Sequence, residues 1–124
     1  MLQIDMTLDR PIFTGEMMLS ILQEIMSIGN KHIGVSLLGN HWQTTHQNVS
    51  ATFPALKNWS VDSFVKISCC ESILLRELTE EDMEGITLWL QQVIREGERI
   101  NADFRKILNN SSTSLLAKYF LEII

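Results

Sequence analysis

The sequence contains few of the residue types that build covalent or metal-bound structures. Its 124 residues include two cysteines, two prolines and one tyrosine. The cysteines, Cys69 and Cys70, are adjacent, and neighbours seldom form a disulfide because the bridge strains the peptide between them. No spaced set of cysteine and histidine residues has the pattern of a zinc site. We therefore expect a chain that folds in a reducing compartment without disulfides, metal or other cofactors.

Basic residues and long apolar runs are also scarce. Lys and Arg number 10 against 15 Asp and Glu, which gives a net charge of −5. Nucleic acids and anionic membranes both attract basic surfaces, so neither is an expected partner. No apolar run approaches the roughly 20 residues that span a bilayer, and MLQIDMTLDR lacks the basic start of a signal peptide. These absences predict a cytoplasmic protein that binds another protein, without membrane insertion.

The first thirty residues contain one strand-like and one helix-like pattern. Residues 2–8 alternate apolar with polar, as in a half-buried strand. Thr14 is suited to the N-cap of a helix, and the sequence Gly29-Asn30 is a typical stop signal. Between them, apolar residues recur at helical spacing, and they are Met18, Ile21, Leu22, Ile25 and Ile28. The spacing predicts a helix over residues 14–28.

Residues 32–78 have the short apolar runs and turn residues that are typical of strands. HIGVSLL and HWQTTHQ would pair as a hairpin around Gly39-Asn40. NVSATF stops before Pro54, and VDSFVKISC and ESILLREL would flank a tight connection at Cys70-Glu71. Between these runs, PALKNWS is long enough only for a turn or a very short helix.

Residues 79–107 carry the strongest local signal in the chain. Thr79 would be the N-cap, and Asp82 three residues later makes a near capping box. Eight apolar-face positions then follow at steps of three and four, and they are Met83, Ile86, Leu90, Val93, Gly97, Ile100, Phe104 and Ile107. This repeat predicts one long amphipathic helix. A glycine on its apolar face costs about 1 kcal/mol relative to alanine, so we expect a sheet or second helix to approach closely at Gly97.

Together these patterns predict an α+β fold. It would have an antiparallel sheet of about five to six short strands, one shorter N-terminal helix and one long C-terminal amphipathic helix. Residues 1–110 would form a single α+β domain. Residues 111–124, which include LLAKYFLEII, would form an apolar C-terminal tail helix that docks either on its own domain or on a partner.

The stretch LQEIMSIG resembles the phosphatase helix of the CheC/CheX family, in which Glu and Asn lie three apart on one helix face. The resemblance covers Glu24, Ile25, Ile28 and Gly29, but Ser27 occupies the asparagine position. Without the amide, no group orients an attacking water. We therefore interpret Glu24 as a solvent-facing residue of a packed helix, and a degenerate CheC-like phosphatase ranks last among the alternative functions.

The other candidate catalytic residues also lack partners. His41 and His46 are five apart, which would place them on opposite faces of a strand, and His32 has no ligand partner nearby in sequence. We interpret them as surface residues whose role stays open. No pattern supplies a base for Cys69 or Cys70. The sequence therefore predicts no catalytic residues and a protein that is not an enzyme.

The candidate partner-binding residues are aromatic or belong to the apolar tail. Tryptophan is enriched at binding hot spots, although it can equally close the edge of a core. A tail as apolar as LLAKYFLEII needs a surface on which to dock. The candidates are Trp42, Trp59, Trp89, Leu115, Leu116, Tyr119 and Phe120.

From Thr14 onward the chain resembles the class I chaperones of bacterial type III secretion, which are small, acidic and cytoplasmic. FVKISCCESILLRELTEEDMEGITLWLQQVIREGERINADFRKIL is similar to the closing hairpin and final helix of that family. The resemblance implies a non-enzymatic module that holds a client segment unfolded along the first helix and a sheet edge. It also implies a homodimer, although PALKNWS is shorter than the helix that forms the family's dimer interface.

Two further functions fit a small acidic protein. One is an immunity or inhibitor protein that neutralises a toxin or enzyme, because acidic charge complements a basic active site. The other is a small structural subunit of a larger assembly, docked through LLAKYFLEII.

Overall fold

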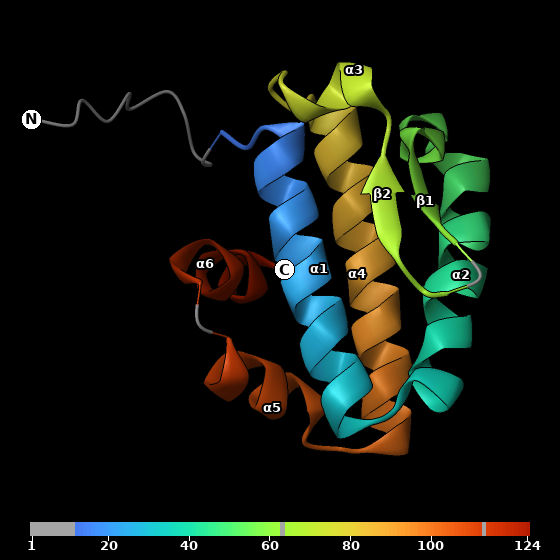
Figure 1. Cartoon of the computed structure of the whole chain (residues 1–124), viewed down its shortest axis with the longest axis vertical. Coiled ribbons are helices and arrows are strands. Elements are labelled where there is room, and N and C mark those ends of the chain that lie inside the picture. The colour runs from blue at the N-terminus through green and yellow to red at the C-terminus, as the bar shows by residue number, and fades with distance from the viewer. Residues whose placement is uncertain (1–11, 63, 113) are drawn as a thin grey trace, which may run out of the picture.

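In the computed structural model the described residues are 12–62, 64–112 and 114–124, and most of them are helical (Figure 1). The elements are α1 (Gly15–His32), α2 (Val35–Thr52), the 3-10 helix η1 (Pro54–Asn58), β1 (Trp59–Val61), β2 (Ile67–Cys69), α3 (Glu71–Leu74), α4 (Glu80–Ile100), α5 (Phe104–Ser111) and α6 (Leu115–Ile123). The predicted α+β fold with five to six strands is wrong, because the described residues form helices and one two-stranded sheet. The strand predicted at residues 2–8 lies outside the described residues.

The first predicted helix is confirmed, and it is longer than expected. The Thr14 side chain caps α1 by accepting a hydrogen bond from the Met17 N–H at 3.2 Å. The helix continues past the predicted stop at Gly29. A Cβ atom on Gly29 would lie 2.6 Å from Leu38 and 3.3 Å from Phe104, so this glycine allows close packing inside the helix.

The predicted hairpin over HIGVSLL and HWQTTHQ is wrong, because these residues form the end of α1 and most of α2. The residues that α2 buries lie at helical spacing, and they include Leu38, Trp42, Thr45 and Val49. Gly39, predicted as a turn residue, faces the side chain of Val65 instead. Burial of these residues against α4 therefore favours a helix over the predicted hairpin.

The sheet is a single antiparallel hairpin that lies beside α1 and α2. Trp59 pairs with Cys69, and Val61 pairs with Ile67. ESILLREL, predicted as a strand, instead contains the short helix α3. At the hairpin connection, the Asp62 carboxylate accepts hydrogen bonds from the backbone N–H groups of Phe64 and Lys66, each at 2.9 Å.

The capping box of α4 is confirmed, and the single long helix is wrong at its C-terminal end. Helix α4 ends at Ile100, and α5 begins at Phe104. The Asn101 side chain accepts a hydrogen bond from the Asp103 N–H at 3.0 Å, which stabilises the turn between them. A Cβ atom on Gly97 would lie 2.2 Å from the Phe104 ring. The close approach expected at Gly97 is therefore confirmed, and Phe104 of α5 makes it.

The apolar tail docks on its own protein. Helix α6 buries Ala117, Phe120 and Leu121 and packs against α1 (Figure 1). The Phe120 ring meets the Phe13 ring edge to face, with centroids 5.9 Å apart. Residues 115–123 thus share the core of the preceding helices. Among the described residues, no helix has the length and apolar character needed to cross a membrane.

Candidate partner-binding groove

Four of the predicted partner-binding residues lie in the core. Trp42, Trp89 and Phe120 are 0% exposed, and Trp59 is 1% exposed. The Trp89 indole N–H donates a hydrogen bond to the Trp42 carbonyl at 3.1 Å, and the two rings meet edge to face at 5.5 Å. Trp42 and Trp89 thus join α2 to α4, and none of the four buried side chains presents a surface to a partner.

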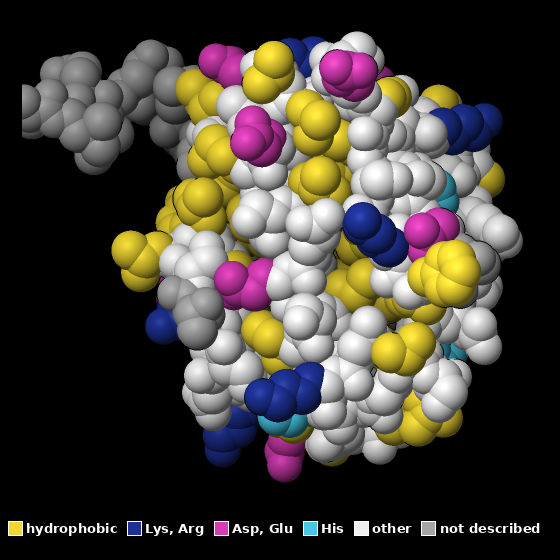
Figure 2. Space-filling model, viewed as in Figure 1, with side chains coloured by type: hydrophobic (Ala, Val, Ile, Leu, Met, Phe, Trp, Pro, Cys, Tyr) yellow, Lys and Arg dark blue, Asp and Glu magenta, His cyan; other side chains and the backbone are white. Residues whose placement is uncertain are grey.

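The other three predicted residues are exposed on α6. Leu115 is 81% exposed, Tyr119 43% and Leu116 40%. Figure 2 shows hydrophobic side chains gathered over α6 and the first turns of α1, in the upper left of the view. Ile123 is seven residues after Leu116, so these two side chains share one face of α6. Ile123 also lines a groove whose other residues lie mostly on α4.

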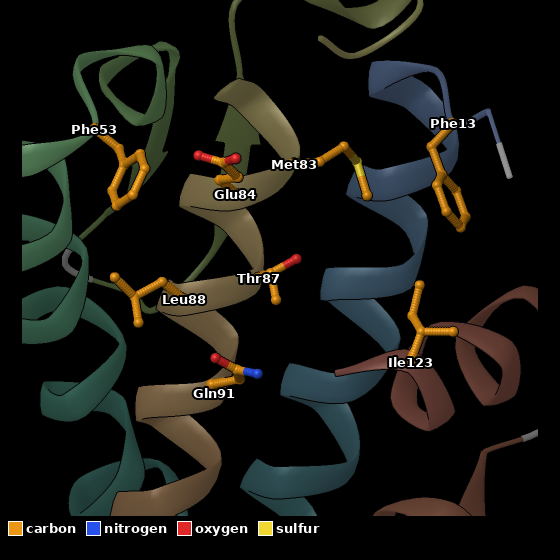
Figure 3. Close-up of a pocket in the computed structure, with 8 residues that line it drawn as sticks. All are labelled: Phe13, Phe53, Met83, Glu84, Thr87, Leu88, Gln91 and Ile123. Atoms are coloured by element: carbon orange, nitrogen blue, oxygen red, sulfur yellow. The ribbon is translucent and has the colours of Figure 1, made fainter. Parts of the chain in front are cut away.

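The groove lies along the outer surface of α4 and has a volume of about 430 Å³. Its floor is one face of α4, and its walls come from segments far apart in sequence (Figure 3). Phe53, at the end of α2, lies on one side, and Phe13 and Ile123 lie on the other. The floor residues are Met83, Glu84, Thr87, Leu88 and Gln91.

Burial of the opposite face of α4 explains why these residues point outward. Ile86, Trp89, Leu90 and Val93 fill the core, so the positions between them face the solvent. Gly85 lets the Phe53 wall approach, because a Cβ atom there would already lie 3.1 Å from the Cβ of Phe53.

The second wall is fixed by the backbone around Phe13. Its carbonyl accepts a hydrogen bond from the Leu78 N–H at 2.8 Å, and its ring packs on Phe120. Thr14 also bridges to Glu77 in antiparallel pairing. The groove therefore has walls that are positioned by the fold on both sides.

The chemistry of the groove suits apolar side chains. Five of its eight lining residues are hydrophobic, and Glu84 is the one ionisable group among the described residues that line it. General acid–base catalysis needs a positioned titratable group within reach of a reacting atom, and usually a second one. Nowhere in the described ranges do three or more His, Cys, Asp or Glu side chains gather as metal ligands. The arrangement can bind apolar groups, and Thr87 and Gln91 can form hydrogen bonds to polar groups beside them.

A second hollow, of about 360 Å³, lies between α2 and α4, and it is polar. Glu96 on its floor pairs with Arg99, at 3.0 Å between Oε1 and Nη1, and lies 4.0 Å from His41. The residues that line it are His41, Thr44, Thr45, Asn48, Gln92, Arg95, Glu96 and Arg99.

Three residues considered as catalytic candidates, Glu24, His46 and Cys69, have surroundings that give them structural roles. Glu24 accepts a hydrogen bond from the Ser114 N–H at 3.4 Å, so it joins α1 to the start of α6. His46 lies 3.0 Å from the Leu56 carbonyl, and its ring meets Trp89 at 5.0 Å. Burial, with a smaller contribution from the neighbouring Cys70, raises the pKa of the Cys69 thiol. A raised pKa keeps this thiol protonated and makes it a poorer nucleophile.

The groove was not among the features predicted from the sequence. One local signal was present: Leu88 is apolar but lies off the buried stripe of α4. The chain matches no family model, no curated protein and no solved structure. The function is therefore inferred from the geometry of the chain itself.

Proposed function

We propose that this protein is a non-enzymatic protein-binding module that holds an apolar segment of another protein in the groove on α4. The observation that carries the proposal is the groove itself: hydrophobic walls from Phe53, Phe13 and Ile123 enclose the half-buried Leu88 and Met83. Apolar grooves of this kind accept the apolar face of a peptide.

The free energy gained by burying a single apolar side chain is small, so the groove favours a segment with several of them. Burying one Leu or Phe side chain contributes about 1.5–3 kcal/mol. Ordering a peptide and fixing it on a surface offsets much of that gain. A partner must therefore place two or three such side chains in the groove together. Ile123, which is 48% exposed, would become covered in the complex.

The proposal keeps the client-holding function that the secretion-chaperone resemblance implies. It assigns client binding to a surface other than the sheet edge. The two strands of the hairpin have three residues each, so they offer a short edge to a client. The groove on α4 takes the place of that edge. A cytoplasmic location and a homodimer belong to the same proposal, since a chaperone of this class meets its client before export and acts as a dimer.

The test compares groove variants with a matched control. Tagged protein would be used to capture partners from its native cell, with wild type, Ile123→Asp, Leu88→Asp and Leu37→Asp in parallel. Leu37 is 54% exposed on α2 and does not line the groove, so it controls for loss of an exposed apolar side chain. We expect one partner to be lost from the two groove variants and kept by Leu37→Asp. Circular dichroism would verify that each variant is folded.

A photo-cross-linker at position 91 then locates the contact. With p-benzoylphenylalanine in place of Gln91, the partner should cross-link through a predominantly apolar segment. Equal capture by all four proteins, or no cross-link at position 91, would show that the groove does not bind partners. The nature of the captured protein separates the alternatives: a disordered segment supports a chaperone, a folded toxin or enzyme an inhibitor, and subunits of one machine a structural role.

A further inference from the structure

The apolar groove and the polar hollow follow one another along α4. Leu88 lines the groove, and Arg95, seven residues later and so on the same face of α4, lines the polar hollow. From Met83 to Arg99 the two cover seventeen residues of α4, and the sixteen steps between these two residues span about 24 Å at 1.5 Å per residue. A ligand that lies along α4 would therefore meet hydrophobic side chains first and polar side chains after them.

The polar hollow is locally basic on a protein that is acidic overall. Arg95 and Arg99 are four residues apart on α4, and His41 faces them from α2. Glu96 is the one carboxylate among the described residues that line the hollow, and Arg99 pairs with it. Arg95 makes no hydrogen bond or ion pair with another residue that the structure describes. Its guanidinium donors are thus available to an anion from outside.

We propose that the segment bound in the groove is an amphipathic helix whose acidic side chains bind Arg95 and Arg99. This inference rests on the proposed function and names the chemistry of its partner. Guanidinium groups pair with carboxylates through planar, two-pronged hydrogen bonds. The neighbouring Thr44 and Asn48 can donate further hydrogen bonds to the same side chains.

The spacing of the groove and the polar hollow along α4 favours a helical partner. A helix parallel or antiparallel to α4 has the same rise per residue, so its side chains stay in step with those of α4. Apolar residues at i, i+3, i+4 and i+7 would occupy the groove beside Leu88. Acidic residues about two turns further along would then reach Arg95 and Arg99. The local charge thus selects an acidic segment, the opposite of what the net charge of −5 would attract.

The test uses two synthetic peptides of about sixteen residues, matched to the length of α4 that the two regions cover. Both carry the same leucines at helical spacing. Two turns further along, one peptide has glutamates and the other has lysines. Binding to the full chain would be measured by fluorescence anisotropy. We expect the glutamate peptide to bind about tenfold more tightly at low salt, and the difference to shrink at high salt because the ion pairs are exposed.

Charge-reversal variants show which residues select the partner. Arg95→Glu and Arg99→Glu should each remove or invert the preference for the glutamate peptide. Lys106→Glu changes the net charge by the same amount on the exposed surface of α5, so it should leave the preference unchanged. Leu88→Asp should weaken both peptides, because it alters the shared apolar contact.

The outcomes distinguish the two proposals. If both peptides bind equally and Leu88→Asp releases both, the groove binds apolar segments but the acidic-helix inference is wrong. If the glutamate peptide is preferred but Leu88→Asp has no effect, the basic hollow binds anions alone and the inference of one continuous helix is wrong. If neither peptide binds the wild-type chain, both proposals fail.

Discussion

Helices α2 and α4 pack against each other but are stabilised in different ways. Helix α4 begins with a capping box, has three acidic residues in its first turn and ends with Arg99 in its last turn. Helix α2 begins at Val35, its N-cap residue Gly34 provides no side-chain cap, and neither terminal turn carries a charge that complements the helix dipole. Local interactions therefore specify α4, whereas α2 depends on the core that it joins.

Among the elements that pack on α2, α4 makes the most extensive contact. Trp42 and Val49 are buried, and the Trp42 carbonyl accepts the hydrogen bond from Trp89. The Thr45 hydroxyl donates to the His41 carbonyl, which satisfies a polar group inside the core. Threonine and valine are weak helix formers. Without α4 this segment has little reason to be helical.

Removing the contact between the two helices should have the largest effect. Trp89→Ala leaves a cavity and removes the hydrogen bond to Trp42, so the free energy of unfolding should fall by about 3–5 kcal/mol. Urea unfolding measures this loss. Hydrogen exchange by mass spectrometry should show that α2 loses protection before the first turns of α4 do.

Leu88→Ala is the control for that experiment, because Leu88 is the neighbouring residue and lies on the groove side of α4. It should cost less stability and leave the protection of α2 unchanged. If Trp89→Ala left α2 as protected as α4, α2 would be stabilised by something other than this contact.

Loss of the α4 cap should have a smaller and more local effect. The Asp82 carboxylate accepts hydrogen bonds from the Thr79 N–H at 2.8 Å and from Arg76 at 2.9 Å. Asp82→Ala should therefore cost about 1–2 kcal/mol, mostly from the cap. The ion pair adds little, because the Arg76 side chain is 40% exposed.

The measurement for Asp82→Ala is again urea unfolding with hydrogen exchange. Exchange should quicken at the first turn of α4 and stay unchanged in α2. Glu81→Ala, an exposed change in the same turn, is the control and should be nearly neutral. A loss of protection that spread equally through α2 would contradict local specification of α4.

The same contrast explains what the sequence could predict of the fold. Thr14, Thr79 and Asp82 act within three residues of themselves, so the starts of α1 and α4 follow from local pattern. Helix α2 was missed because Gly39-Asn40 suggested a hairpin turn, whereas the residues that α2 buries are selected by tertiary contacts, most of all with α4. The apolar repeat of α4 runs on into Phe104 because α5 joins the same core, so it hid the turn at Asn101.

The candidate site was harder to predict than the fold. Its walls come from Phe13, Phe53 and Ile123, which are separated by up to 110 residues, the difference between positions 13 and 123. No local pattern can show that such residues meet. The three tryptophans, which are buried in the core, illustrate a related limit of local pattern: a large aromatic residue has the same sequence signature in a core as at a binding surface.

The smallest predicted effect concerns the uncapped start of α2. Gly34 has φ +108°, a conformation that residues with a side chain rarely adopt, and a Cβ atom there would meet nothing within 4 Å. The cost of Gly34→Ala is therefore purely conformational, about 1 kcal/mol. Thermal unfolding should show a modestly lower Tm, with faster exchange at the first turn of α2 and none of that change in α4. Ser36→Ala, an exposed change two residues later, should not lower the stability, because alanine is a good helix former. An unchanged Tm for Gly34→Ala would mean that α2 can begin with a different backbone conformation. The start of α2 would then depend still less on local structure than the missing cap alone indicates.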